Sequence, residues 1–186
     1  MERVCKYMIY MFLADGFEEV EALTVVDLLR RAEVEIKTVS VMGRQKVVSS
    51  HKVEIMADIL FEDIADDAQM LILPGGIPGT PNLAAHEGLD RLIRKSAEKK
   101  IYLAAICAAP TVYGGKGLLT DKKATCYPGM EAELQCAEVS YDNVVVDGNF
   151  ITSRGLGTAI DFGLKLVEIL KSKELADAIA AKIVYR

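Results

Sequence analysis

The chain has 186 residues, of which 51% are hydrophobic and 26% are charged, and its formal net charge is −5 at pH 7. This length predicts one domain whose core is large enough to fold without metal or disulfide staples. The acidic balance and the scattered basic residues argue against a protein that binds nucleic-acid phosphates, and no apolar stretch approaches the roughly 20 residues needed to cross a membrane.

Charged residues flank a short apolar run within residues 1–6, which is not the pattern of a cleaved secretion signal, so we expect a cytoplasmic protein. The four cysteines, at positions 5, 107, 126 and 136, contain no Cys-x-x-Cys pair. The two histidines, His51 and His86, lie far from them in sequence. We therefore expect no metal site and no disulfide framework.

Strands and helices alternate in the first half of the chain. An apolar run at 7–14 predicts a buried strand, and Asp15-Gly16 then leads into a helical pattern that ends near Ala32. The next strand-like segments are 34–41, a hairpin made of 46–48 and 53–56, and 70–73. An amphipathic helix is predicted over 88–100.

The second half begins with a fully apolar strand at 101–106, which runs directly into Cys107 and a short helix from Pro110. Strand-like segments then follow at 124–127, 144–146 and 150–152, and helical spacing returns at 160–170 and 173–183. Strands that are apolar on both faces and alternate with helices predict a mostly parallel sheet covered on both sides, within one α/β domain over 1–186.

Cys107 is the first candidate for chemistry. Ligands of such sheets bind beyond the carboxyl ends of the strands, where Cys107 follows the strand at 101–106. A cysteine often only fills space in a core. Here Pro110 suits the first turn of a helix, whose positive end would lower the thiol pKa from about 8.5 toward roughly 5 to 7. We therefore predict that Cys107 is a nucleophile.

Glu21 is the second candidate. Asp15 and Glu18 have the spacing of a capping box, and Glu19 is close enough to the helix start to interact with its dipole, but Glu21 has neither explanation. A solvated edge position is the open alternative. If Glu21 reaches Cys107, two negative charges about 4 Å apart would cost about 4 kcal/mol at an effective dielectric of 20. We therefore predict one shared proton, with Glu21 protonated and donating to the thiolate.

Gly75 and Gly76 follow the strand at 70–73. Glycine pairs usually mark only a tight turn. At the end of a parallel strand, however, the backbone N–H of Gly76 and that of Ala108 are suited to stabilise a developing oxyanion. Gly75 is expected at the edge of the same site.

Four segments occur in a recognisable order: 18–21 (EEVE), 73–76 (LPGG), 104–110 (AAICAAP) and 152–158 (TSRGLGT). Together they resemble the ThiJ/PfpI superfamily, specifically the branch of the parkinsonism-associated protein deglycase and its bacterial relatives. The resemblance runs over nearly the whole chain. It implies a flavodoxin-like three-layer sandwich related to class I glutamine amidotransferases, and a homodimer.

The resemblance also implies roles for individual residues. Cys107 matches the readily oxidised nucleophile of the family, and Glu21 matches the buried glutamate that bonds to it. Gly76 and Ala108 match the residues whose amides bind the oxyanion. Arg154 resembles the arginine near the dimer-side rim of the site.

Among the positions that depart from the family pattern, two bear directly on function. Tyr127 precedes Pro128 where the family often has a histidine, so a Cys-His protease or amidotransferase arrangement lacks its base unless His51 or another chain supplies one. His51 itself stands where relatives have an arginine. We expect Tyr127 and His51 at the substrate-binding rim.

The resemblance implies a cofactor-free glyoxalase or deglycase acting on methylglyoxal-like 2-oxoaldehydes or their early protein adducts. Two alternatives remain open. One is a redox-sensing stress protein or chaperone in which Cys107 is oxidised to a sulfinate. The other is a cysteine peptidase or amidotransferase-like hydrolase, which Tyr127 disfavours. The expected partners are a small aldehyde or a glycated protein, and a second copy of the chain.

Overall fold

The computed structural model of the protein describes residues 7–185. The expectations about a secretion signal in residues 1–6 and about Cys5 lie outside the described residues. Across 7–185, every helix is too short or too polar to cross a bilayer. Cys107, Cys126 and Cys136 are free thiols.

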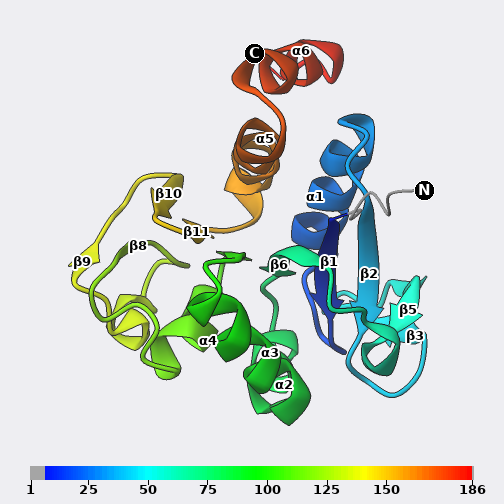
Figure 1. The fold of residues 1–186 in the computed structure, drawn as a ribbon, viewed down its shortest axis with the longest axis vertical. Coiled ribbons are helices and arrows are strands. Elements are labelled where there is room, and N and C mark those ends of the chain that lie inside the picture. The colour runs from blue at the N-terminus through cyan, green and yellow to red at the C-terminus, as the bar shows by residue number, and fades with distance from the viewer. Residues whose placement is uncertain (1–6, 186) are drawn as a thin grey trace, which may run out of the picture.

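A seven-stranded sheet forms the middle layer of the fold (Figure 1). In spatial order its strands are β10 (Val144–Asp147), β11 (Phe150–Ser153), β7 (Tyr102–Ile106), β6 (Ala68–Leu73), β1 (Met8–Leu13), β2 (Ile36–Ser40) and β5 (Ile59–Leu60). All neighbouring strands of this sheet are parallel except β10 and β11. The carboxyl ends of the parallel strands therefore meet at one edge, and the predicted mostly parallel sheet is confirmed.

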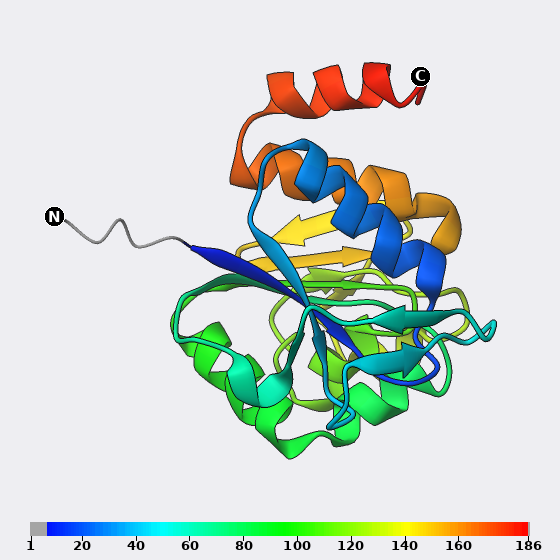
Figure 2. The ribbon, with the colours of Figure 1, turned by 90° about the vertical axis from the view of Figure 1, so that its right-hand side faces the viewer.

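Helices cover both faces of this sheet (Figure 2). One face carries α1 (Glu19–Arg31), α5 (Ala159–Leu170) and α6 (Lys173–Lys182), and the other carries α2 (Gly79–Ala85), α3 (Glu87–Glu98) and α4 (Pro110–Gly115). On the first face α1 packs against α5, and α5 packs against α6. The result is a three-layer α/β sandwich.

Strand β1 shows why the sequence forms this architecture. Ile9, Met11 and Leu13 contribute to the core beneath α1, whereas Tyr10 and Phe12 contribute to the core on the opposite face. All five side chains are at most 2% exposed. Because successive side chains of a strand point to opposite faces, a strand buried on both sides has no polar position.

Two small sheets lie beside the main one. β3 (Lys46–Val48) pairs with β4 (Glu54–Met56) in the predicted antiparallel hairpin, and β8 (Lys123–Ala124) pairs with β9 (Glu138–Val139). The strand predicted at 124–127 ends at Ala124, because the N–H of Thr125 donates to the Thr152 hydroxyl instead. Within residues 7–185 there are also three short 3₁₀ helices: η1 (Phe61–Asp63), η2 (Glu131–Leu134) and η3 (Leu156–Thr158).

Helix α1 does not begin as predicted. Its N-cap is Glu18, whose Oε2 accepts the N–H of Glu21 at 2.6 Å. Asp15 instead accepts the N–H of Val48 at 3.0 Å and pairs with Arg44. The predicted capping box is therefore wrong, because Asp15 joins the β1–α1 turn to the hairpin.

Candidate active site

Cys107 occupies a sharp turn directly after β7. Its φ of +65° lies in the left-handed region that residues other than glycine rarely adopt. Its N–H donates to the carbonyl of Ser153 at 3.0 Å, and its own carbonyl accepts the N–H of Tyr127 at 2.8 Å. The strained turn is thus held from two sides, and the side chain remains partly exposed.

Glu21 lies in the first turn of α1 and is only 1% exposed, so the alternative of a solvated edge position is wrong. Its Oε2 accepts the N–H of Gly75 at 2.9 Å. A hydrogen bond joins its carboxyl group to the Cys107 side chain. The structure therefore brings the two predicted catalytic side chains together, although they are 86 positions apart (107 − 21) in the sequence.

Two backbone amides face the same sulfur. The N–H groups of Ala108 and Gly76 both hydrogen bond to Cys107. Gly76 has a φ of +97°, and a Cβ there would lie 2.4 Å from the carbonyl oxygen of Gly16 and 2.5 Å from the nitrogen of Glu18. Only glycine fits this backbone conformation and this close approach.

Gly75 is needed for a different reason. A Cβ at this position would lie 2.5 Å from Cβ of Cys107 and 2.7 Å from Oε2 of Glu21. The missing side chain at the end of β6 is therefore what allows the thiol and the carboxyl group to meet beside the backbone.

Burial dominates the protonation of the thiol. It raises the pKa of Cys107 to about 12, the negative charge and hydrogen bond of Glu21 act in the same direction, and the amides of Ala108 and Gly76 oppose them. The predicted lowering of the thiol pKa is therefore wrong. Helix α4 has only six residues, and the loss of water around the sulfur outweighs any effect of its dipole.

Burial also raises the pKa of Glu21 to about 7. The hydrogen bonds from Cys107 and from the Gly75 N–H oppose this rise, and the charge of Glu18 adds to it. Because the carboxyl group and the thiol interact, they titrate as a pair. Above pH of about 7 the pair carries one negative charge and one proton, and the position of that proton decides whether the sulfur is a nucleophile.

A pocket of about 340 Å³ opens over Cys107. Its walls are formed by Gly76, Ile77, Cys107, Ala108, Tyr127, Pro128, Gly129 and Met130. Four of these residues were not predicted from the sequence: Ile77, Pro128, Gly129 and Met130. Ile77 directly follows the glycine pair and Pro128 directly follows Tyr127, so their positions offered a signal. Met130 has no such signal and is recognisable only in the folded chain.

Arg154 and His51 do not line this pocket. The guanidinium of Arg154 lies over the ring of Tyr141, 6.0 Å from its centre. His51 is in the β3–β4 hairpin, with Nδ1 3.0 Å from Oε1 of Glu19. The other histidine, His86, accepts the N–H of Leu89 as the N-cap of α3. Neither histidine takes the place of the base that a Cys-His hydrolase requires.

The family model described as DJ-1/PfpI family matches residues 7–169. The chain belongs to the DJ-1/PfpI family. It is 37% identical over 173 residues to protein dj-1beta of Drosophila melanogaster, covering 91% of this chain and 92% of that relative. It is 38% identical over 164 residues to protein DJ-1 homolog B of Arabidopsis thaliana, covering 87% of this chain. The chain spans only 37% and 45% of the length of two Arabidopsis relatives that it matches.

Solved structures of DJ-1 proteins share the fold. Oxidized DJ-1 of Toxoplasma gondii aligns with a TM-score of 0.93 at 32% identity, covering 96% of this chain and 98% of that one. A more distant DJ-1/PfpI relative, 29% identical over 165 residues and covering 87% of both chains, is named glutathione-independent glyoxalase DJR-1.2 of Caenorhabditis elegans. The family and the flavodoxin-like fold expected from the sequence are confirmed.

Proposed function

We propose that this DJ-1/PfpI protein is a cysteine-dependent, cofactor-free glyoxalase or deglycase that acts on methylglyoxal-like 2-oxoaldehydes or their early protein adducts. The observation that carries the proposal is the environment of the Cys107 sulfur. It lies beside a pocket, and it hydrogen bonds to the buried carboxyl group of Glu21 and to two backbone amides. The name of the C. elegans relative supports the same reaction class.

In the reactive form of the pair, the shared proton is on Glu21 and the charge is on sulfur. The thiolate then accepts hydrogen bonds from the N–H groups of Gly76 and Ala108 and from the protonated carboxyl group. The Gly75 N–H still donates to Glu21. Donors aimed at the sulfur stabilise its charged form and make this arrangement accessible, although the higher pKa of Cys107, about 12 against about 7 for Glu21, places the resting proton on the sulfur.

The first step is addition of the Cys107 thiolate to the aldehyde carbon. A carbon–sulfur bond forms, and the π electrons of the carbonyl move to its oxygen. The amides of Gly76 and Ala108 are suited to stabilise this oxyanion as charge leaves the sulfur. Glu21 then donates its proton to the oxygen, which gives a neutral hemithioacetal and a carboxylate.

The second step moves hydrogen between the two substrate carbons. The Glu21 carboxylate removes the proton from the former aldehyde carbon, which gives an enediolate. The hydroxyl proton of that carbon passes to the oxygen of the neighbouring carbon, and Glu21 returns its own proton to the neighbouring carbon. The former aldehyde carbon is oxidised to a thioester and the ketone carbon is reduced to an alcohol, so no external electrons are needed. Water then hydrolyses the thioester, releasing a 2-hydroxy acid and regenerating Cys107.

Incubation with methylglyoxal tests this reaction. We expect lactate from the wild-type protein, none from Cys107→Ala, and at least a 100-fold lower rate from Glu21→Gln, since general acid–base catalysis commonly contributes that much. Cys136→Ala, which changes a partly buried thiol outside the pocket lining, serves as the matched control and should keep full activity. Equal lactate production by wild type and Cys107→Ala would refute the proposal.

A second candidate function is redox sensing at the same thiol. The two amides and Glu21 around the sulfur are suited to bind the oxygens of a sulfinate, and the T. gondii relative was solved in an oxidized form. Two molecules of hydrogen peroxide would each transfer one oxygen atom to the sulfur and leave as water. Intact mass after mild peroxide treatment tests this: a two-oxygen adduct on Cys107, combined with absence of lactate production, favours sensing over catalysis.

A further inference from the structure

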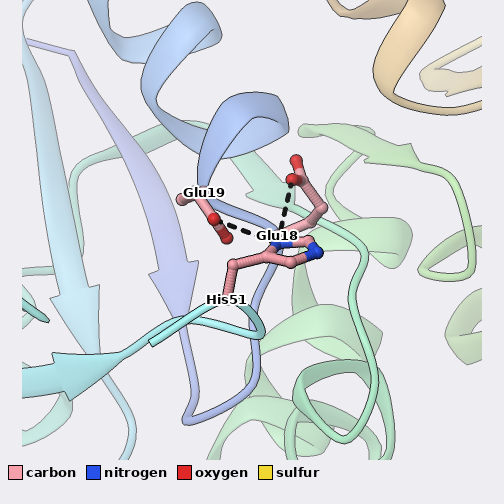
Figure 3. A group of neighbouring side chains, drawn as sticks. All are labelled: Glu18, Glu19 and His51. Carbon is pink, nitrogen blue, oxygen red and sulfur yellow. Dashed lines mark ion pairs between the residues drawn. The ribbon is translucent and has the colours of Figure 1, made fainter. Parts of the chain in front are cut away.

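A second group of titratable side chains lies outside the Cys107 pocket. Glu18 and Glu19, at the start of α1, face His51 from the β3–β4 hairpin (Figure 3). Nδ1 of His51 is 3.0 Å from Oε1 of Glu19 and 4.0 Å from Oε1 of Glu18. One nitrogen or oxygen atom from each residue falls within 4.8 Å of the other two.

The side chain of Glu18 gives an independent indication that this group of residues can bind a cation. Its side chain is only 10% exposed. Within the part of the chain that the structure describes, its buried Oε1 has no hydrogen-bond partner, while its Oε2 accepts the N–H of Glu21. A buried carboxylate oxygen without a donor costs free energy, so a bound cation at this position would be stabilising.

We propose that Glu18, Glu19 and His51 bind one divalent transition-metal ion of the Zn²⁺ class. Two carboxylates and a neutral imidazole supply two negative charges and a donor set that suits such ions. Ligand atoms about 2.1 Å from a tetrahedral ion lie about 3.4 Å apart. The observed separations of 3.0 and 4.0 Å fall on either side of this value, so small side-chain rotations suffice.

The ligands are held in place by neighbouring groups. The N–H of Glu21 anchors Glu18, and the hydroxyl of Ser50 lies 3.4 Å from Oε2 of Glu19. The N–H of Ser50 donates to the carbonyl of Phe17 at 2.8 Å, which ties the hairpin to the start of α1. Such supporting hydrogen bonds orient ligands and strengthen metal binding. Because the side chain of His51 is 69% exposed, water can complete the coordination.

Titration of the full chain with Co²⁺ tests the site, because cobalt reports its ligands in the absorption spectrum. We expect one bound ion per chain, with visible bands of nitrogen and oxygen ligands and without a thiolate-to-cobalt charge-transfer band. Glu19→Gln and His51→Arg should each weaken binding at least tenfold. The guanidinium of the second variant is permanently charged and would itself occupy the space between the carboxylates.

His86→Gln is the matched control, since it removes the other histidine of the chain and should leave the affinity unchanged. Thermal unfolding without metal checks that each variant folds. If Glu19→Gln does not fold, the affinity of His51→Arg alone decides the test. Absence of binding, equal affinity in wild type and His51→Arg, or a thiolate charge-transfer band would each overturn the assignment. Lactate production is not part of this test, so the metal site and the proposed enzyme activity succeed or fail separately.

Discussion

The protonation of Cys107 and Glu21 depends on their burial more than on their positions in the secondary structure. The turn before α4 suggested a thiol of low pKa, but burial raises the pKa values of both groups, to about 12 for Cys107 and about 7 for Glu21. Reactivity near neutral pH therefore requires that the pair's remaining proton resides on the carboxyl group.

The pH dependence of Cys107 alkylation tests the position of this proton. In the wild type, iodoacetamide labelling should rise with a midpoint near pH 7, because the pair acquires its single charge there and the share of the pair that carries this charge on sulfur reacts. In Glu21→Gln the thiol ionises alone while burial still opposes its charge, so the midpoint should move upward. Peptide mass spectrometry separates Cys107 from the other thiols. A wild-type midpoint as high as that of Glu21→Gln would show that the proton does not move from the sulfur to Glu21 near neutral pH.

Glu21 should also make stability depend on pH. Its pKa is raised from 4.5 to about 7 in the folded protein, so folding favours the protonated form. That contribution is complete below pH 4.5 and is lost as the pH rises through about 7. Relative to the neutral variant Glu21→Gln, the wild type should lose up to roughly 3 kcal/mol of unfolding free energy between pH 5 and pH 8. Urea unfolding at both pH values measures this; an unchanged difference would contradict it.

Helix α4 packs against the backbone of the 3₁₀ helix η2 at Gly114. A Cβ at Gly114 would lie 2.4 Å from the carbonyl oxygens of both Glu133 and Leu134. These are backbone atoms, which cannot rotate away as a flexible side chain can. This close approach holds η2 directly after the pocket wall formed by residues 127–130.

Substitution of adjacent glycines tests the contact. Gly114→Ala should reduce the unfolding free energy by about 1 to 3 kcal/mol, because a close-packed contact must open. Gly115→Ala is the matched control in the same helix: apart from its chain neighbours and the backbone of its own helix, no atom lies within 4 Å of its Cβ position, and we expect no loss of stability. Urea unfolding of both variants gives the comparison. Equal stabilities would show that η2 moves away at no cost.

On the surface of the molecule, helix α1 exposes two large apolar side chains. Val20 is 44% exposed and Leu23 is 39% exposed, although the opposite side of the helix is packed in the core. The family resemblance implies a homodimer, and these two side chains, three residues apart, lie on one helix face. We therefore place the expected contact between subunits on this face of α1.

If the chain forms the expected homodimer through this face, Leu23→Glu should give a monomer, because the new charge would be buried against a second copy. Light scattering coupled to size-exclusion chromatography measures the mass. Val184→Glu is the control, since Val184 is 90% exposed at the end of the chain. A wild-type monomer, or a Leu23→Glu dimer, would exclude this face as the contact.

Several features followed from local patterns in the sequence. Strands β1, β6 and β7 were predictable because residues apolar on both faces of a strand require cover on both sides of the sheet. Cys107 and Gly76 could then be assigned to one edge, since the carboxyl ends of parallel strands converge. Helix α2 escaped prediction because Gly79 and Pro81 in its first turn hide the helical pattern.

Other features became definite only in the folded chain. The directions in which the pKa values of Cys107 and Glu21 shift depend on how much water folding removes from around the two side chains. This loss of water results from contacts with residues that are far apart in the sequence. The same holds for Met130 in the pocket wall and for His51, which lies beside Glu18 and Glu19 and not in the wall of the Cys107 pocket. The spacing of apolar residues in the sequence indicates which face of a helix or strand is buried. The loss of water around an individual side chain, and the identity of its neighbours, depend on how the helices and strands pack together.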